Sequence, residues 1–125
     1  MAQWWPEQAD FAEGFIMWRG LGVNYEFGVL EAPARVAIHF AHRLGAITAT
    51  AILLLVTVGY WRKTDSPTMR TACAVVWLAL ATQISLGLAT VWFGLPLPIA
   101  TAHNGIAAVL LLTVINLNNV ASRAT

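Results

Sequence analysis

The chain has 125 residues and a formal net charge of +1, and 58% of its residues are hydrophobic whereas only 10% are charged. Because about a quarter of the residues of a soluble domain are charged, this composition excludes an ordinary water-soluble surface. The near-neutral charge argues against nucleic-acid binding, and the single cysteine, Cys73, excludes a disulfide scaffold. A small integral membrane protein of one domain is the class that remains.

The first segment, residues 1–34, is acidic and interrupted by proline, glycine and aromatic residues. It contains five acidic residues against one basic residue, Arg19. We expect it to lie outside the membrane, with a short amphipathic helix at about Phe11–Trp18. It lacks the basic start and the apolar run of a signal peptide.

Two long stretches without charge follow, between Arg43 and Arg62 and between Arg70 and Arg123. One membrane crossing takes about 20 residues, so the second stretch is long enough for more than one. It is broken at Gly94-Leu-Pro-Leu-Pro98, which predicts a tight turn. The predicted fold class is therefore an all-α membrane protein with three transmembrane helices in residues 35–125. These helices are expected at about residues 35–61, 71–93 and 98–120.

The loop between the first two helices sets the expected orientation. Residues 61–70 contain three basic residues and one acid, Asp65, which places this loop in the cytoplasm by the positive-inside rule. The C-terminus is then cytoplasmic and the acidic N-terminal segment periplasmic, in a cell inner membrane. Arg35 and Arg43 lie at the outer end of the first helix, against the rule. A charge such as Arg43 within a span indicates a function or a paired anion.

Two histidines, His42 and His103, are the main candidates for chemistry within the membrane. With three crossings the first and third helices run in the same direction. His42 follows Arg35 by seven residues, about 10 Å of helical rise, and His103 follows Pro98 by five, about 8 Å. Two imidazoles at similar depth on two helices suit axial ligation of one haem iron.

The neighbours of these histidines fit a flat macrocycle, although they also fit simple helix packing. Small side chains at Gly45, Ala46 and Ala49 follow His42 at helical spacing, which is common where membrane helices pack closely. Arg43 is a candidate partner for a haem propionate. His39 lies one turn before His42, and we interpret it as an interfacial or supporting group rather than a ligand.

On the middle helix three residues at helical spacing share one face: Gln83, Gly87 and Thr90. Gln83 is the large polar residue of this face. We expect it to support the cofactor site from the middle helix.

These residues resemble haem A synthase. The resemblance rests on Ala34-Arg-Val-Ala-Ile-His-Phe-Ala-His-Arg-Leu-Gly-Ala46, Gln83-Ile-Ser-Leu-Gly-Leu-Ala-Thr90 and Ala100-Thr-Ala-His-Asn-Gly105. Gln3-Trp-Trp-Pro6 and Gly20-Leu-Gly-Val-Asn-Tyr-Glu-Phe-Gly28 resemble the outer loop of proteobacterial members, so the resemblance spans nearly the whole chain.

The resemblance implies a reaction and an architecture for whole family members. They convert haem O to haem A for terminal oxidases, by oxidising a porphyrin methyl group to a formyl group. Typical members have eight membrane helices in two four-helix halves, of which the C-terminal half holds a haem b. This chain resembles that C-terminal half, with His42 and His103 at its two ligand positions.

The chain also departs from the family pattern. The first helix of the half, a cysteine pair and the whole N-terminal half with its acidic catalytic residue have no counterpart in these residues. A haem with two axial histidines has no vacant position, which suits electron transfer. We therefore expect this chain to be a truncation, a fragment or one subunit of a split enzyme, and not to complete the reaction alone.

The expected partners are membrane lipid, haem, and either a missing N-terminal half, a second copy or haem O synthase, without nucleic acid. Two alternatives remain open from the residues alone. One is a small cytochrome b subunit of a quinone-linked electron-transfer chain, in which the histidines have the same role. The other is a non-catalytic membrane assembly protein, in which they are packing residues.

Overall fold

The computed structural model describes residues 9–15 and 32–124, and every regular element in these ranges is a helix. The helices are α1 (Phe11–Gly14), α2 (Ala32–Lys63), α3 (Pro67–Trp92) and α4 (Leu97–Ala124). The last three are long and apolar enough to cross a membrane. Even the shortest of them, α3 with 26 residues, rises about 39 Å, more than the roughly 30 Å of hydrocarbon in a bilayer. The predicted fold class is confirmed.

The chain divides within α2 into two compact units, Met1–Ala49 and Thr50–Thr125, which are described separately. In the first unit the backbone N–H of Asp10 donates to the carbonyl of Pro33 at 2.9 Å. The ring of Phe11 meets Phe40 edge-on, with centroids 6.1 Å apart. These contacts hold α1 against the beginning of α2. The short helix expected at Phe11–Trp18 is present as α1, while Trp18 lies outside the described residues.

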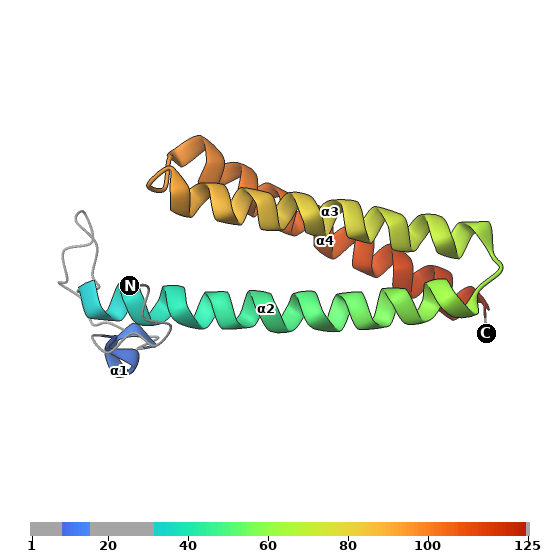
Figure 1. Ribbon diagram of the computed structural model, residues 1–125, viewed down its shortest axis with the longest axis horizontal. Coiled ribbons are helices and arrows are strands. Elements are labelled where there is room, and N and C mark those ends of the chain that lie inside the picture. The colour runs from blue at the N-terminus through green and yellow to red at the C-terminus, as the bar shows by residue number, and fades with distance from the viewer. Residues whose placement is uncertain (1–8, 16–31, 125) are drawn as a thin grey trace, which may run out of the picture. The chain divides into compact units, whose positions relative to one another are not determined.

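In the second unit, α3 and α4 pack against each other as an antiparallel pair (Figure 1). Apolar residues on α3 recur three and four positions apart, which places them on one face of the helix. This face and one residue of α4 form the core, which consists of Met69, Ala72, Cys73, Val76 and Leu117. Most of the remaining apolar side chains of the long helices are exposed, as suits a helix surrounded by lipid.

The beginning of α3 differs from the expectation by four residues, since the helix starts at Pro67 rather than near residue 71. The side-chain oxygen of Ser66 accepts a hydrogen bond from the backbone N–H of Met69 at 3.4 Å. Proline suits the first helical turn because its missing N–H would be unpaired there anyway. The proline therefore begins the helix instead of prolonging the loop.

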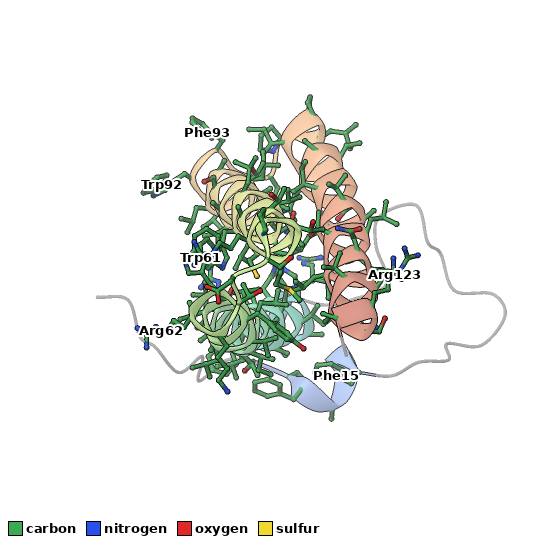
Figure 2. All side chains as sticks on the ribbon, turned by 90° about the vertical axis from the view of Figure 1, so that its right-hand side faces the viewer. Phe15, Trp61, Arg62, Trp92, Phe93 and Arg123 are labelled. Carbon is green, nitrogen blue, oxygen red and sulfur yellow. The ribbon has the colours of Figure 1, made fainter. Side chains whose placement is uncertain are left out.

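The connection between α3 and α4 is the tight turn that the sequence predicts. Two residues in succession have positive φ, Gly94 at 71° and Leu95 at 60°. The N–H of Leu95 donates to the carbonyl of Thr90 at 2.7 Å, so this carbonyl in the last turn of α3 has a hydrogen-bond partner. Trp92 and Phe93 project outward at this end of the helix pair (Figure 2) and are 83% and 70% exposed.

Within the second unit, the C-terminal part of α2 is joined to α3 by a polar and aromatic contact. The indole N–H of Trp77 donates to the hydroxyl oxygen of Thr57 at 2.6 Å. Thr57 is fully buried, and its own hydroxyl donates to the carbonyl of Leu53 at 2.6 Å. The rings of Trp61 and Trp77 lie 5.0 Å apart, and the Arg70 guanidinium lies over Trp61 at 5.5 Å.

Candidate functional site

The structure brings His103 of α4 against Gln83 of α3, inside the second unit. The two residues are 20 positions apart in the chain, and their Nε2 atoms lie 3.4 Å apart. Both side chains are half-buried. A histidine in the second turn of α4 thus meets the one large polar residue that the sequence places on this face of α3.

Gly87, one turn after Gln83, provides the space for the imidazole. A Cβ atom at this position would lie 3.1 Å from Cε1 of His103 and 3.7 Å from its Nδ1. A distance of 3.1 Å is closer than carbon atoms pack without strain, so a side chain at residue 87 would shift the ring by a few tenths of an ångström. The hydroxyl of Thr90 donates to the carbonyl of Gly87 at 2.6 Å and leaves the ring contact undisturbed.

The amide oxygen of Gln83 is buried and accepts no hydrogen bond from any residue that the structure describes. An amide carries an acceptor as well as two donors, and buried polar groups are normally satisfied. The position beside His103 therefore has unused hydrogen-bonding capacity in the interior of the α3–α4 pair.

The other predicted site residues lie on α2, in the first unit. His42 and Arg43 are exposed on the surface of this helix, as is His39 one turn earlier. Gly45 has open space where a Cβ would be, with nothing within 4 Å among the described residues. The pairing of His42 with His103 stays a prediction.

The donor set suits a haem better than a bare metal ion. The described residues contain no group of three or more His, Cys, Asp or Glu side chains that could hold a metal ion. A porphyrin supplies four of the iron ligands itself, so the protein needs to add only one or two. A single imidazole in a space kept open by glycine, such as His103, fits that requirement.

Two shallow grooves in the second unit lie at the far end of the α3–α4 pair from His103. Both are lined by Thr68, Asn116 and Val120. Neither groove includes His103 in its lining.

The hydrogen bond from Trp77 to Thr57 does not involve His103 either. The sequence analysis did not predict this hydrogen bond, because a tryptophan and a threonine in apolar helices carry no pairing signal by themselves.

The family model for the cytochrome oxidase assembly proteins called COX15-CtaA matches residues 1–115. The heme A synthase of Shewanella oneidensis is 40% identical over 114 residues, which are 91% of this chain and 34% of that relative. The heme A synthase of Rhodospirillum centenum is 34% identical over 106 residues, 85% of this chain and 27% of the relative. That of Roseobacter denitrificans is 33% identical over 110 residues, 86% of this chain and 25% of the relative.

No solved structure matches this chain significantly. The chain covers about a third or less of the length of each of these relatives. The resemblance to haem A synthase is confirmed by relatives that match most of the chain. Because the family model matches over nine-tenths of these residues, the chain belongs to the COX15-CtaA family of cytochrome oxidase assembly proteins.

Proposed function

We propose that this chain is the haem-b-binding, electron-transferring part of a haem A synthase-like protein, with His42 and His103 as the axial ligands. The observation that carries the proposal is the placement of His103 in the α3–α4 pair, against a glycine that leaves room for its ring. Members of this family are expected to convert haem O to haem A, and this chain would contribute electron transfer to that reaction.

The side chains of this chain have distinct roles in the proposal. His103 and His42 would each hold the haem iron through one imidazole nitrogen. The exposed guanidinium of Arg43, next to His42, would pair with a propionate through a charge-assisted hydrogen bond. Gln83 contacts His103 and acts on the ligand through that contact.

When bound, the haem supplies one-electron chemistry at its iron. With both histidines engaged, His42 and His103 would hold a haem suited to electron transfer, and oxidation of the substrate's methyl group would belong to another part of the protein. The chain alone then transfers electrons and does not complete the synthesis of haem A.

The same proposal includes a location and partners. The basic residues Arg62, Lys63 and Arg70 flank the α2–α3 loop and favour a cytoplasmic position for it. With three spans, the N-terminus is then periplasmic and the C-terminus cytoplasmic, in an inner membrane. The exposed apolar surfaces contact lipid and either an N-terminal half, a second copy or haem O synthase.

The test is a reduced-minus-oxidised absorption spectrum of the chain purified from membranes in mild detergent. We expect a low-spin b-type signal in the wild type that is lost in both His42→Ala and His103→Ala. His39→Ala is the matched control, one turn away on the same helix, and should keep the signal. A spectrum and haem content unchanged by replacing His42 or His103 would refute the ligand assignment.

A further inference from the structure

The two grooves of the second unit adjoin each other, because Thr68, Asn116 and Val120 line both of them. Their volumes are about 360 and 430 Å³, within the range of small-molecule pockets. They run between the beginning of α3 and the end of α4, which lie at the same end of the helix pair (Figure 1). We refer to the two together as the end groove.

The lining of the end groove changes from apolar to polar along its length. Toward the middle of α3 it is lined by Ala72 and Val75. Toward the end of α4 it is lined by Asn119 and Arg123. Arg123 is the one cation among the described lining residues, and none of these residues is an acid. An apolar section thus leads to a cationic section, which is the order in which a phospholipid presents its acyl chain and its phosphate.

The depth of this change matches the border of a membrane. Asn116 follows Leu97, the first residue of α4, by 19 residues, about 28 Å of helical rise. A bilayer has about 30 Å of hydrocarbon, and the exposed Trp92 before α4 suits the opposite interface. Asn116 then lies near the border of the hydrocarbon. Arg123, seven residues further, lies about 10 Å beyond it, among the headgroups.

The donors of the end groove suit a phosphate. Nε of Arg123 donates to Oδ1 of Asn119 at 3.3 Å, one turn earlier on α4. A guanidinium carries five N–H donors, and this contact uses one of them. The two terminal amino groups form a fork that matches two oxygens of a phosphate. The amide of Asn116 and the hydroxyl of Thr68 line the same groove and add neutral donors.

The charges around the groove favour an anionic lipid over a neutral one. Residues 61–125 contain four basic residues and one acid, Asp65. The basic residues lie in the last turns of α2 and α4 and the first turn of α3, all at this end of the unit: Arg62, Lys63, Arg70 and Arg123. Basic residues at a membrane surface attract anionic headgroups.

We propose that the end groove binds one anionic phospholipid, with its phosphate at Arg123 and the first part of an acyl chain between α3 and α4. The bound lipid connects the beginning of α3 to the end of α4. None of the described residues that line the groove belongs to the proposed haem site, so this inference does not depend on the proposed function.

Native mass spectrometry of the full chain, released from detergent micelles that contain phosphatidylglycerol, tests the proposal by counting bound lipids. We expect one phosphatidylglycerol to be retained per chain at low lipid fraction. Phosphatidylcholine with the same acyl chains should be retained less, because its headgroup has no net charge. An excess of glycerol 3-phosphate should leave the bound phosphatidylglycerol in place, because this soluble compound lacks the acyl chains.

Arg123→Gln should weaken the retention of phosphatidylglycerol about fivefold, the factor that one cation near a membrane surface contributes. Arg62→Gln is the matched control, because it removes the same charge from the same end of the unit. Arg62 does not line the groove and lies on the opposite side from Arg123 (Figure 2). The control should weaken retention by less than about twofold, since salt screens an exposed charge that is not in contact with the lipid.

A second pair of variants tests the groove without changing the charge. Asn116 and Asn118 are both exposed on α4, and only Asn116 lines the groove. Asn116→Leu should weaken retention about threefold, the factor of an average hydrogen bond within a membrane. Asn118→Leu should retain the lipid as the wild type does. Helix content from circular dichroism verifies that each variant is folded.

Four results would overturn the proposal. Equal retention of phosphatidylglycerol and phosphatidylcholine would show that the groove does not recognise charge. Equal losses in Arg123→Gln and Arg62→Gln would show a diffuse attraction by the surface. Displacement by glycerol 3-phosphate would indicate a site for a phosphate group alone. A dimer without lipid that dissociates in Asn116→Leu would assign the groove to a second copy of the chain.

Discussion

Gly87 is the residue on which the position of the candidate ligand depends. Gly87→Ala would place a methyl carbon 3.1 Å from Cε1 of His103, so the ring must shift by a few tenths of an ångström. Overpacking of this kind costs roughly 1 kcal/mol or more. Because the shift displaces the nitrogen that we propose binds iron, we expect haem affinity to fall about fivefold, measured by titration of haem into the purified protein.

Gly105→Ala is the matched control for this prediction. Gly105 lies on α4, two residues after His103, and a Cβ there meets nothing within 4 Å among the described residues. The control should therefore bind haem as the wild type does. Equal affinities in Gly87→Ala and the wild type would mean that the ring is not confined by this glycine.

Residue spacing predicts part of this site and leaves another part open. Helical periodicity places Gln83 and Gly87 on one face of α3, and the structure brings both to His103. Which nitrogen of the ring meets the amide depends on the crossing of two helices and on side-chain rotamers, neither of which periodicity specifies. The partner of His42 stays a prediction for the same reason.

At the scale of helices, the contact between Trp77 and Thr57 links α2 to α3 within the second unit. Trp77→Phe removes the indole N–H that donates to the buried hydroxyl of Thr57. We expect a loss of about 1 kcal/mol in the free energy of unfolding, the range of an interhelical hydrogen bond together with the smaller ring. Unfolding in mixtures of mild and denaturing detergent, followed by circular dichroism, measures this loss.

A double-mutant cycle with Thr57→Val isolates the hydrogen bond from the change in ring size. Valine keeps the shape of threonine and removes its hydroxyl. If the contact stabilises the structure, the two substitutions together cost less than the sum of their separate effects. Strict additivity would show that the hydrogen bond contributes nothing to the packing of α2 on α3.

The turn between α3 and α4 allows a prediction about the backbone. Gly94 has a φ of 71°, a conformation that costs a residue with a Cβ roughly 1 kcal/mol. Gly94→Ala should therefore lower the free energy of unfolding by about that amount. Gly59→Ala on α2 is the control, because its Cβ position is open and alanine favours a helix. If Gly94→Ala lowered the free energy of unfolding no more than Gly59→Ala does, or raised it, the result would argue against the left-handed turn.

The ends of the helices were harder to predict than their existence. A run without charged residues identifies a membrane span. The helix itself can continue past that span where the backbone N–H and C=O groups at its ends find hydrogen-bond partners. Ser66 and Pro67 begin α3 four residues before the expected start, through a capping hydrogen bond and a proline in the first turn. Composition identifies the apolar span and not the caps that flank it.

For the whole molecule, the charge pattern predicts an orientation that can be measured from both sides of the membrane. Asp65 lies in the α2–α3 loop and Phe93 at the end of α3, and both are exposed. The native Cys73 is fully buried, so it contributes little background to thiol labelling. Asp65→Cys and Phe93→Cys thus place one accessible thiol at each end of α3.

A membrane-impermeant maleimide should label Phe93→Cys in intact spheroplasts, because the α3–α4 turn is expected on the periplasmic side. Asp65→Cys should react only after the membrane is permeabilised, since the three basic residues favour a cytoplasmic position for its loop. Labelling in the reverse order would invert the orientation. It would put the first turns of α2, and with them Arg43 and His42, on the cytoplasmic side of the membrane.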